Sequence, residues 1–253
     1  IPMKSLVLTQ PTYLPWLGMI DQLDFADVVC IYDSIPLPRT SGGRSRGFST
    51  RVQILNGNNK SWLTIPIPKQ TISQSTNISN INISSENWMK KHRKTIRHSY
   101  SHCKNYKEID EKVLAPLFDT THENINLNEF LLDGMTRILK CFNIKKEFHS
   151  STNNIGTIQS NEKTEKLVRH CKHYGCDTYI SGLGALSYIN HDLFVANKID
   201  VYYMDYTITP YEQGKEIDFD PYVTSIDYLV RKTEDSVHVN KSSLIHWSMM
   251  VSK

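Results

Sequence analysis

Three residues in a turn near the start of the chain could contact a ligand. Gln10 follows an apolar run, and Tyr13 and Trp16 lie in a proline-flanked turn directly after it. The amide of Gln10 can donate and accept hydrogen bonds, and Tyr and Trp rings give a sugar or a base a flat apolar face with a polar edge. We predict that Gln10, Tyr13 and Trp16 bind substrate; the alternative is that this turn packs a corner of the core.

Two further residues could act as acid or base. Asp33 ends an apolar run at 28–32, where its carboxylate could bind a sugar hydroxyl, hold a metal, accept a proton or cap the next loop. His92 follows Lys91 in a basic segment, and an imidazole titrates near neutral pH, as suits a general base. Asp33 and His92 are therefore our catalytic candidates, and for His92 the alternative is an ordinary surface histidine.

A third group of residues could bind an anion. The guanidinium of Arg51 can form a bidentate contact to phosphate, and Lys91 adds a second positive charge. The bend Ser181-Gly182-Leu183-Gly184 comes between a predicted strand and a predicted helix, where backbone amides can hold an anion or a developing oxyanion. The bend lacks the third glycine of a dinucleotide fingerprint and the Lys-Ser/Thr pair of a P-loop. We predict substrate contacts by Arg51, Lys91, Ser181 and Gly182.

The residue types that bind metals do not form a recognisable metal site. The chain has 5 cysteines, and none belongs to a CxxC pair. His98 and His102 are four residues apart on a predicted helix, but no matching pair of carboxylates is evident. We expect no metal, and the odd number of cysteines fits free thiols in a reducing cytoplasm.

Composition excludes several classes of protein. The chain has 253 residues, of which 39% are hydrophobic and 22% are charged, as in an ordinary globular protein. No apolar run is long enough to cross a bilayer, and the short run after Lys4 does not resemble a secretory signal. A net charge of +3 is too small to indicate nucleic-acid binding. Basic residues cluster at 39–51 and 90–98. These clusters could form a solvated face, or they could bind phosphate groups or an acidic carrier protein. We expect a cytoplasmic protein.

Apolar runs between turn residues predict strands, and apolar residues at helical spacing predict helices. In the first third of the chain the predicted strands are 4–9, 28–32, 51–55, 61–67 and 81–83. Residues 16–25 predict a helix, 36–49 a loop and 70–80 a surface connection. Asn56-Gly57 lies between two alternating runs and therefore indicates a β-hairpin.

Helices dominate the middle of the chain, and strands return after it. The predicted helices are 87–103, 106–120, 127–142, 160–174 and most of 185–196. The predicted strands are 146–150, 177–180 and 201–206. Gly175 is placed to end the fourth helix, and the segment after Asp218 has no readable pattern.

This order of elements predicts an α/β fold, with a parallel-rich twisted sheet, flanking helices and a helical insertion. We expect residues 3–85 and 146–253 to form the α/β domain and 86–145 the insertion. Open α/β sheets bind ligands outside the carboxyl ends of their strands, which is where Gln10, Asp33 and the bend at Ser181 follow their strands.

The segment QPTYLPWLGMIDQLDFADVVCIYD (residues 10–33) resembles the opening of the WbqC-like family. Later segments fit the same family pattern in the same order: 61–66, 88–92, 179–182, 211–213 and 225–227. The resemblance runs from about residue 5 to about residue 229. Tyr211 and Gln213 fit a Tyr-x-Gln element of the family and are predicted to close the pocket. Arg51 fits a family arginine, but this chain has Thr50-Arg51-Val52 where Asn-Arg-Asn is usual.

The resemblance implies a transferase of amino-sugar or O-antigen biosynthesis. It implies N-acyl or aminoacyl transfer to a nucleotide-linked amino sugar, without a cofactor, with an acyl thioester on a carrier protein as the potential donor. In that reaction His92 or Asp33 would be the base, the amides at 181–184 the oxyanion donors, and Arg51 with Lys91 the phosphate anchors.

Two other functions stay open. The opening loosely resembles that of adenylyl-transferring α/β enzymes, which suggests an ATP-using nucleotidyltransferase or ligase. Their paired histidines are absent, because Thr12 and Leu17 stand where a histidine would be wanted. The second alternative is a non-catalytic module that binds a sugar or a carrier.

Overall fold

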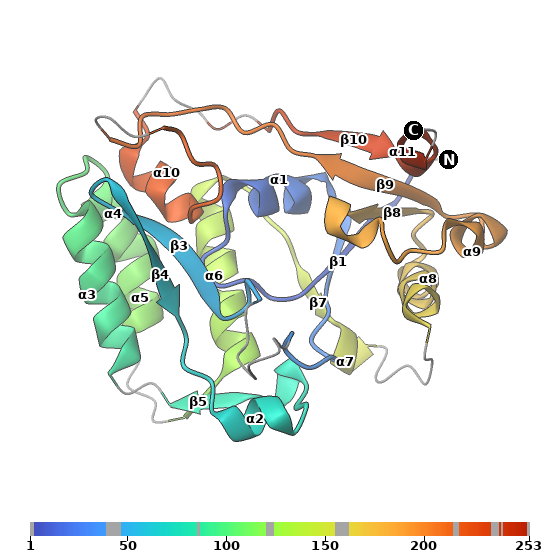
Figure 1. The fold of residues 1–253 in the computed structure, drawn as a ribbon, viewed down its shortest axis with the longest axis horizontal. Helices are drawn as coiled ribbons and strands as arrows, with labels where there is room; N and C mark the ends of the chain where they lie inside the picture. Colours follow the sequence, from blue (N-terminus) through green and yellow to red (C-terminus); the bar gives the residue numbers. More distant parts are fainter. Residues whose placement is uncertain are drawn as a thin grey trace.

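A six-stranded sheet forms the centre of the protein. The computed structural model describes residues 3–38, 47–84, 87–119, 124–154, 162–214, 218–233, 238 and 240–251. The strands of the sheet, in spatial order, are β10 (Ser243–His246), β9 (Asp200–Asp205), β8 (Thr178–Ser181), β1 (Ser5–Thr9), β2 (Val28–Ile31) and β7 (Phe148–Ser150) (Figure 1). Neighbouring strands are parallel from β9 to β7, and β10 is antiparallel to β9. The predicted parallel-rich α/β fold is confirmed.

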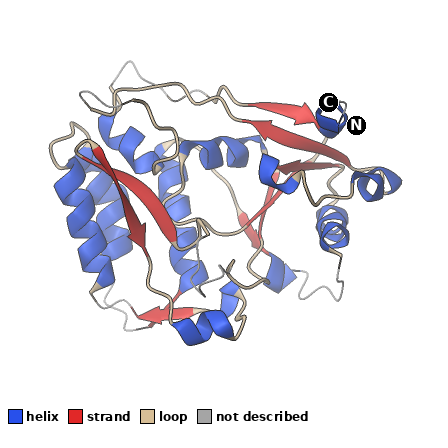
Figure 2. Ribbon diagram, viewed as in Figure 1, coloured by secondary structure: helices blue, strands red, loops and turns tan. Residues whose placement is uncertain are grey.

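Helices cover both faces of the sheet, because successive side chains of a strand point to opposite faces. The covering helices are α1 (Leu17–Phe25), α8 (Lys163–Tyr174) and α9 (His191–Ala196). Val7 packs with α1 in one apolar cluster, whereas Leu6 and Leu8 pack with α8 and α9 in another. Figure 2 shows these helices on the two sides of the strands. The continuous apolar sequence of β1 follows from burial on both faces.

A group of helices packs beside α1 and continues its apolar cluster. They are α3 (Trp88–Tyr100), α4 (Tyr106–Ile109), α5 (Ala115–Phe118), α6 (Leu127–Cys141) and α10 (Ser225–Arg231). Leu131 and Ile138 of α6 lie in the same buried cluster as Val7 of the sheet. The division of the chain at residues 86 and 145 stays a prediction.

The helix predicted at 106–120 is broken into three segments. A π-helical turn, η2 (Asp110–Leu114), separates α4 from α5. Pro116 follows this turn and has no N–H to donate to the preceding turn. A wider turn is one way for a helix to accommodate a proline, so the interruption has a local cause in the sequence.

A hairpin packs against α3. Its strands are β3 (Arg51–Asn56) and β4 (Asn59–Thr64), and Gly57 takes the positive φ of 60° that its tight turn requires. The backbone N–H of Leu55 donates to the Tyr100 hydroxyl of α3 at 3.0 Å. The predicted hairpin is present, and a second small ribbon joins β5 (Asn82–Ser84) to β6 (Asn124–Asn126).

Three segments differ from the prediction. Residues 70–80 are not a plain surface connection, because they form much of α2 (Lys69–Ser73) and all of η1 (Ile78–Asn80) and bury Ile72 and Ile78. Residues 185–196 are helical only at the end of η3 (Leu183–Ala185) and in α9, since the Asn190 side chain caps a new helix. The unreadable segment after Asp218 contains α10, β10 and α11 (Trp247–Val251).

Other boundaries agree more closely or cannot be compared. Gly175 ends α8 in the left-handed conformation, with a φ of 63°. A short helix, α7 (Ser151–Asn154), follows β7. Parts of several predicted elements lie outside the described residues: 39–46 of the loop, 85–86, residue 120, and the helix start at 160–161.

Candidate functional site

The winding of the chain reverses beside β1. From β1 the chain passes through α1 to β2, and from β8 it passes through α9 to β9 on the other side of β1, with the two helices on opposite faces. In open α/β sheets the crevice at such a reversal, outside the carboxyl ends of the strands, is the usual ligand site. We call this region the carboxyl edge, formed by the residues that follow β1, β2 and β8.

The carboxyl edge brings together three of the predicted residues. Because β1 pairs with both β8 and β2, Gln10, Gly182 and Asp33 follow adjacent strands. Gln10 is half-buried, and its Oε1 accepts a hydrogen bond from the Ser49 hydroxyl at 3.4 Å. Ser181 itself is buried, so the backbone from Gly182 onward forms the exposed part of the bend.

Trp16 reaches this edge through an aromatic neighbour. The Tyr206 ring, after β9, lies 5.0 Å from the Trp16 ring, and its hydroxyl donates to Gln22 Oε1 at 3.1 Å. A Cβ on Gly182 would lie 3.5 Å from that hydroxyl. The Trp16 ring has a second aromatic neighbour, the Tyr222 ring, at 5.4 Å, and Tyr222 is 64% exposed. We call Trp16, Tyr206 and Tyr222 the aromatic platform.

Gly18 is what allows the Trp16 ring to lie flat on α1. A Cβ at this position would be 2.1 Å from the ring, far inside van der Waals contact. The spacing of Trp16 and Gly18 is therefore a structural signal for the platform. Tyr206 and Tyr222 could not be predicted from the sequence, because neither belongs to a recognisable motif.

A second missed group lies on the other face of the same edge. Tyr32 precedes Asp33 and therefore points to the opposite face, where its ring meets the edge of His170 at 5.6 Å. The Nδ1–H of His170 donates to the Lys166 carbonyl at 2.6 Å, and its buried Nε2 has no partner among the described residues. Burial lowers the pKa of His170. Lys163 holds its ammonium 5.1 Å from the Tyr188 ring.

Asp33 is buried and fully hydrogen-bonded. Its Oδ1 accepts from the Ser151 hydroxyl and the Thr152 backbone, both at 2.9 Å. Its Oδ2 accepts from the Ser150 hydroxyl at 2.6 Å and from Asn128 Nδ2 at 2.9 Å. The carboxylate thus ties the end of β2 to β7, α7 and α6. Because these bonds occupy both oxygens, the geometry favours a positioning role, and its role as a base stays a prediction.

His92 is also buried and hydrogen-bonded. The Tyr13 hydroxyl lies 2.8 Å from its Nδ1. Burial lowers the pKa of His92 to about 4, although a hydrogen bond to the Thr64 backbone acts on the pKa in the opposite direction. His92 is therefore neutral at neutral pH, and burial raises the pKa of Tyr13. The adjacent Lys91 is exposed on α3. This pair fixes the loop after β1 against α3, and the catalytic role of His92 stays a prediction.

Arg51 uses its guanidinium within the hairpin. The guanidinium carbon lies 3.4 Å from the centre of the Trp62 ring, in a cation–π contact across β3 and β4. The described contacts of Arg51, Lys91 and His92 do not join them to Gly182.

Residues 10–239 match the WbqC-like protein family, which is nearly the whole chain. The chain belongs to this family. It is also similar to a protein of Mycobacterium tuberculosis (strain ATCC 25618 / H37Rv) described as "Uncharacterized protein Rv1507c", with 28% identity over 232 residues, 90% of this chain and 93% of that protein. No solved structure matches the chain significantly.

Tyr211 and Gln213, which the resemblance predicted as a Tyr-x-Gln element, hydrogen-bond to each other in this WbqC-like protein. The Tyr211 hydroxyl donates to Asp227 Oδ2 at 2.8 Å and accepts from Gln213 Nε2 at 3.1 Å. Gln213 also bonds both backbone groups of Asp220 at 2.8 Å. Asp227 is fully buried and pairs with Arg231 at 2.9 Å. Burial raises the pKa of Tyr211, and the Asp227 charge adds to this. These bonds hold the segment before α10 in place. The described hydrogen bonds of Tyr211 and Gln213 do not reach the carboxyl edge, so their role in closing the pocket stays a prediction.

Two negative findings apply to the described part of this WbqC-like chain. No three His, Cys, Asp or Glu side chains among the described residues come together as metal ligands could. No described helix is both long and apolar enough to span a membrane.

Proposed function

We propose that this WbqC-like protein is a transferase of amino-sugar or O-antigen biosynthesis. It moves an N-acyl or aminoacyl group onto a nucleotide-linked amino sugar, with a carrier-protein thioester as donor. The observation that supports this most directly is the carboxyl edge itself: an aromatic platform lies beside the bare backbone of Gly182 at the reversal of the sheet.

Each part of the edge suits one part of such a substrate. The exposed Tyr222 ring next to Trp16 offers a sugar ring an apolar face. The turn from Gly182 into η3 offers backbone amides to an anion or to a thioester carbonyl oxygen. Lys163, at the start of α8, adds positive charge for a diphosphate.

The reaction asks little of the protein beyond positioning. The sugar amine attacks the thioester carbonyl carbon, so that a C–N bond forms and the C–S bond breaks. The thiolate leaves and takes up the proton that the amine releases. Holding the two reactants in line and donating hydrogen bonds to the carbonyl oxygen lower the barrier. In this proposal Asp33 and His92 position the edge, since their polar atoms are already bonded.

Mass spectrometry tests the proposal. The full chain is incubated with nucleotide-linked amino sugars and acyl thioesters of coenzyme A or a carrier protein, and the product is expected to gain the acyl mass. Gly182→Leu should raise KM, because the side chain grows towards Tyr206. Glu111→Leu, which adds the same side chain at an exposed position outside the carboxyl edge, is the matched control.

The other outcomes identify the alternatives. Pyrophosphate release from ATP, without acyl transfer, would indicate a nucleotidyltransferase or ligase. Sugar-nucleotide binding without turnover would indicate a binding module. If the protein neither binds a sugar nucleotide nor transfers an acyl group from any donor, the proposal is overturned.

A further inference from the structure

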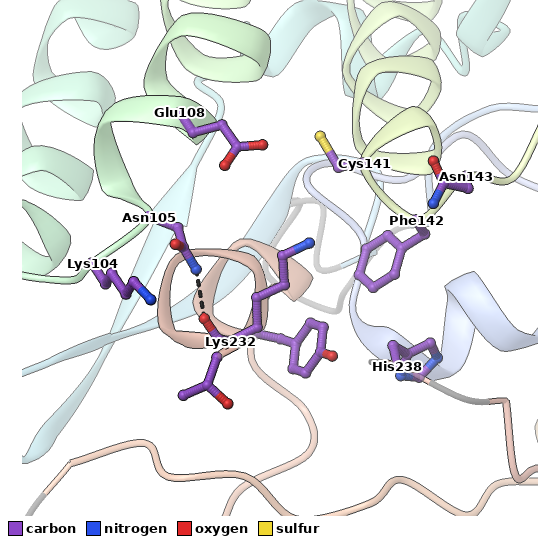
Figure 3. Close-up of a pocket in the computed structure, with 10 residues that line it drawn as sticks. Lys104, Asn105, Glu108, Cys141, Phe142, Asn143, Lys232 and His238 are labelled. Carbon is purple, nitrogen blue, oxygen red and sulfur yellow. Dashed lines mark hydrogen bonds between the residues drawn. The ribbon is translucent and has the colours of Figure 1, made fainter. Parts of the chain in front are cut away.

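A cavity of about 440 Å³ lies at the far end of α6 from Asp33, between α4 and α10 (Figure 3). An α-helix rises about 1.5 Å per residue, so Asn128, which holds Asp33, and Cys141, which lines the cavity, are roughly 20 Å apart along α6. None of the predicted site residues lines it. Its volume lies in the range of small-molecule sites, about 300–1,000 Å³.

The charged side chains of the cavity favour an anion. Lys104 and Lys232 contribute positive charge, and the one acidic group is Glu108. The Glu108 carboxylate is already paired with Lys112, whose ammonium lies 2.6 Å away. Figure 3 shows the Lys232 ammonium extending into the space between Glu108 and Phe142. The described residues form no ion pair with Lys232 within 4.0 Å.

The base of Lys232 is held rigidly by Asn105. The Asn105 side chain donates to the Lys232 carbonyl at 2.6 Å and to the Leu229 carbonyl at 3.4 Å, and its backbone N–H donates to the Val230 carbonyl at 3.1 Å. These bonds satisfy carbonyls at the end of α10 that a helix leaves unpaired. The position from which the lysine chain starts is therefore fixed.

Aromatic rings form the opposite wall. The Phe142 and Tyr228 rings are nearly parallel, at 16° and 5.9 Å, and the His238 ring meets them edge-on at 5.4 and 5.7 Å. His238 is itself oriented by Asp21, whose buried Oδ1 lies 2.7 Å from Nε2. A planar ligand can stack against such a wall.

We propose that this cavity binds a small molecule that combines a planar ring with a phosphate group, with its anion on Lys232 and its ring against Phe142. The cavity is a binding site and not a thiol centre, because burial raises the pKa of the Cys141 thiol. This site is separate from the carboxyl edge and does not depend on the proposed function.

Adenosine 5′-phosphate is a suitable probe, with inorganic phosphate and adenosine as its two halves. Titration calorimetry on the full chain should show tighter binding of adenosine 5′-phosphate than of either half. Lys232→Met should weaken that binding about tenfold, as the loss of one charge contact of about 1.4 kcal/mol predicts. Lys172→Met, an exposed lysine of α8, should leave it unchanged.

A second pair of variants separates this site from the carboxyl edge. Phe142→Leu should weaken adenosine 5′-phosphate and adenosine binding but not phosphate binding, whereas Gly182→Leu should affect none of them. Unchanged affinity in Lys232→Met, or binding that is lost in Gly182→Leu and kept in Lys232→Met, overturns the proposal. Absence of any binding of the three probes overturns it too.

Discussion

The two ends of α6 use their polar groups in opposite ways. At its first turn, Asn128 joins Ser150, Ser151 and Thr152 around Asp33, and both carboxylate oxygens are occupied. At its last turn, the cavity lies open between the ring of Phe142 and the ammonium of Lys232. A closed network stabilises the fold, whereas charge that faces an open cavity remains available to a ligand. A titratable side chain at a strand end is therefore not by itself a catalytic group.

The largest expected effect is loss of the closed network. Asp33→Ala should leave donors from three elements without an acceptor. Two of them, on Asn128 and Ser151, are buried, and each buried unsatisfied group costs about 1–3 kcal/mol. We expect a loss of more than about 3 kcal/mol in the free energy of unfolding, measured by urea titration. Glu111→Ala, at an exposed position, is the control and should change it by less than about 0.5 kcal/mol. If Asp33→Ala abolished acyl transfer at unchanged stability, Asp33 would be a catalytic base after all.

Acid should weaken the second closed pair, Tyr13 and His92. The pKa of His92 is about 4 in the folded protein, below the ordinary value of 6.5, so the unfolded chain binds a proton that the folded chain does not. The contribution of His92 to the free energy of unfolding is therefore fully present above pH 6.5. It falls by at most about 3 kcal/mol as the pH drops towards 4. Urea unfolding at several pH values measures this slope. His92→Gln should flatten it, and an equal slope in that variant would contradict the assignment.

The platform offers a smaller, purely steric test. Gly18→Ala would place a methyl group against the Trp16 ring, and such overpacking costs about 1–3 kcal/mol. The ring should tilt away from Tyr206 and Tyr222, so the variant should lose sugar-nucleotide affinity together with thermal stability. Glu111→Ala, at an exposed position outside the platform, should change neither the sugar-nucleotide affinity nor the melting temperature. A Gly18→Ala protein with normal stability would show that the ring does not lie on α1.

Local sequence patterns were sufficient to predict most of the fold but little of the candidate site. Leu6, Val7 and Leu8 are apolar in a row because two helix layers cover β1, and that run is visible in the sequence. β10 was missed because it has only four residues, of which Ser243 is exposed and three are half-exposed, and its two apolar residues are adjacent and do not alternate with polar ones. The partners of Asp33 come from residues 95 to 119 positions away, and no local pattern places them. The cavity is likewise assembled from three distant segments, so only the structure locates it.

The smallest effect on stability is expected at the open end of α6, together with the clearest effect on binding. Lys232 ends its helix at a half-buried position, so Lys232→Met should change the free energy of unfolding by only about 0.5 kcal/mol. A ligand at about 100 times its Kd stabilises a protein by about 2.7 kcal/mol. At that concentration of adenosine 5′-phosphate, a variant that binds about tenfold more weakly should gain only about 1.4 kcal/mol. Urea unfolding with and without the nucleotide measures both values. Equal gains in the two proteins would show that the ammonium does not meet the phosphate, and that both ends of α6 are structural.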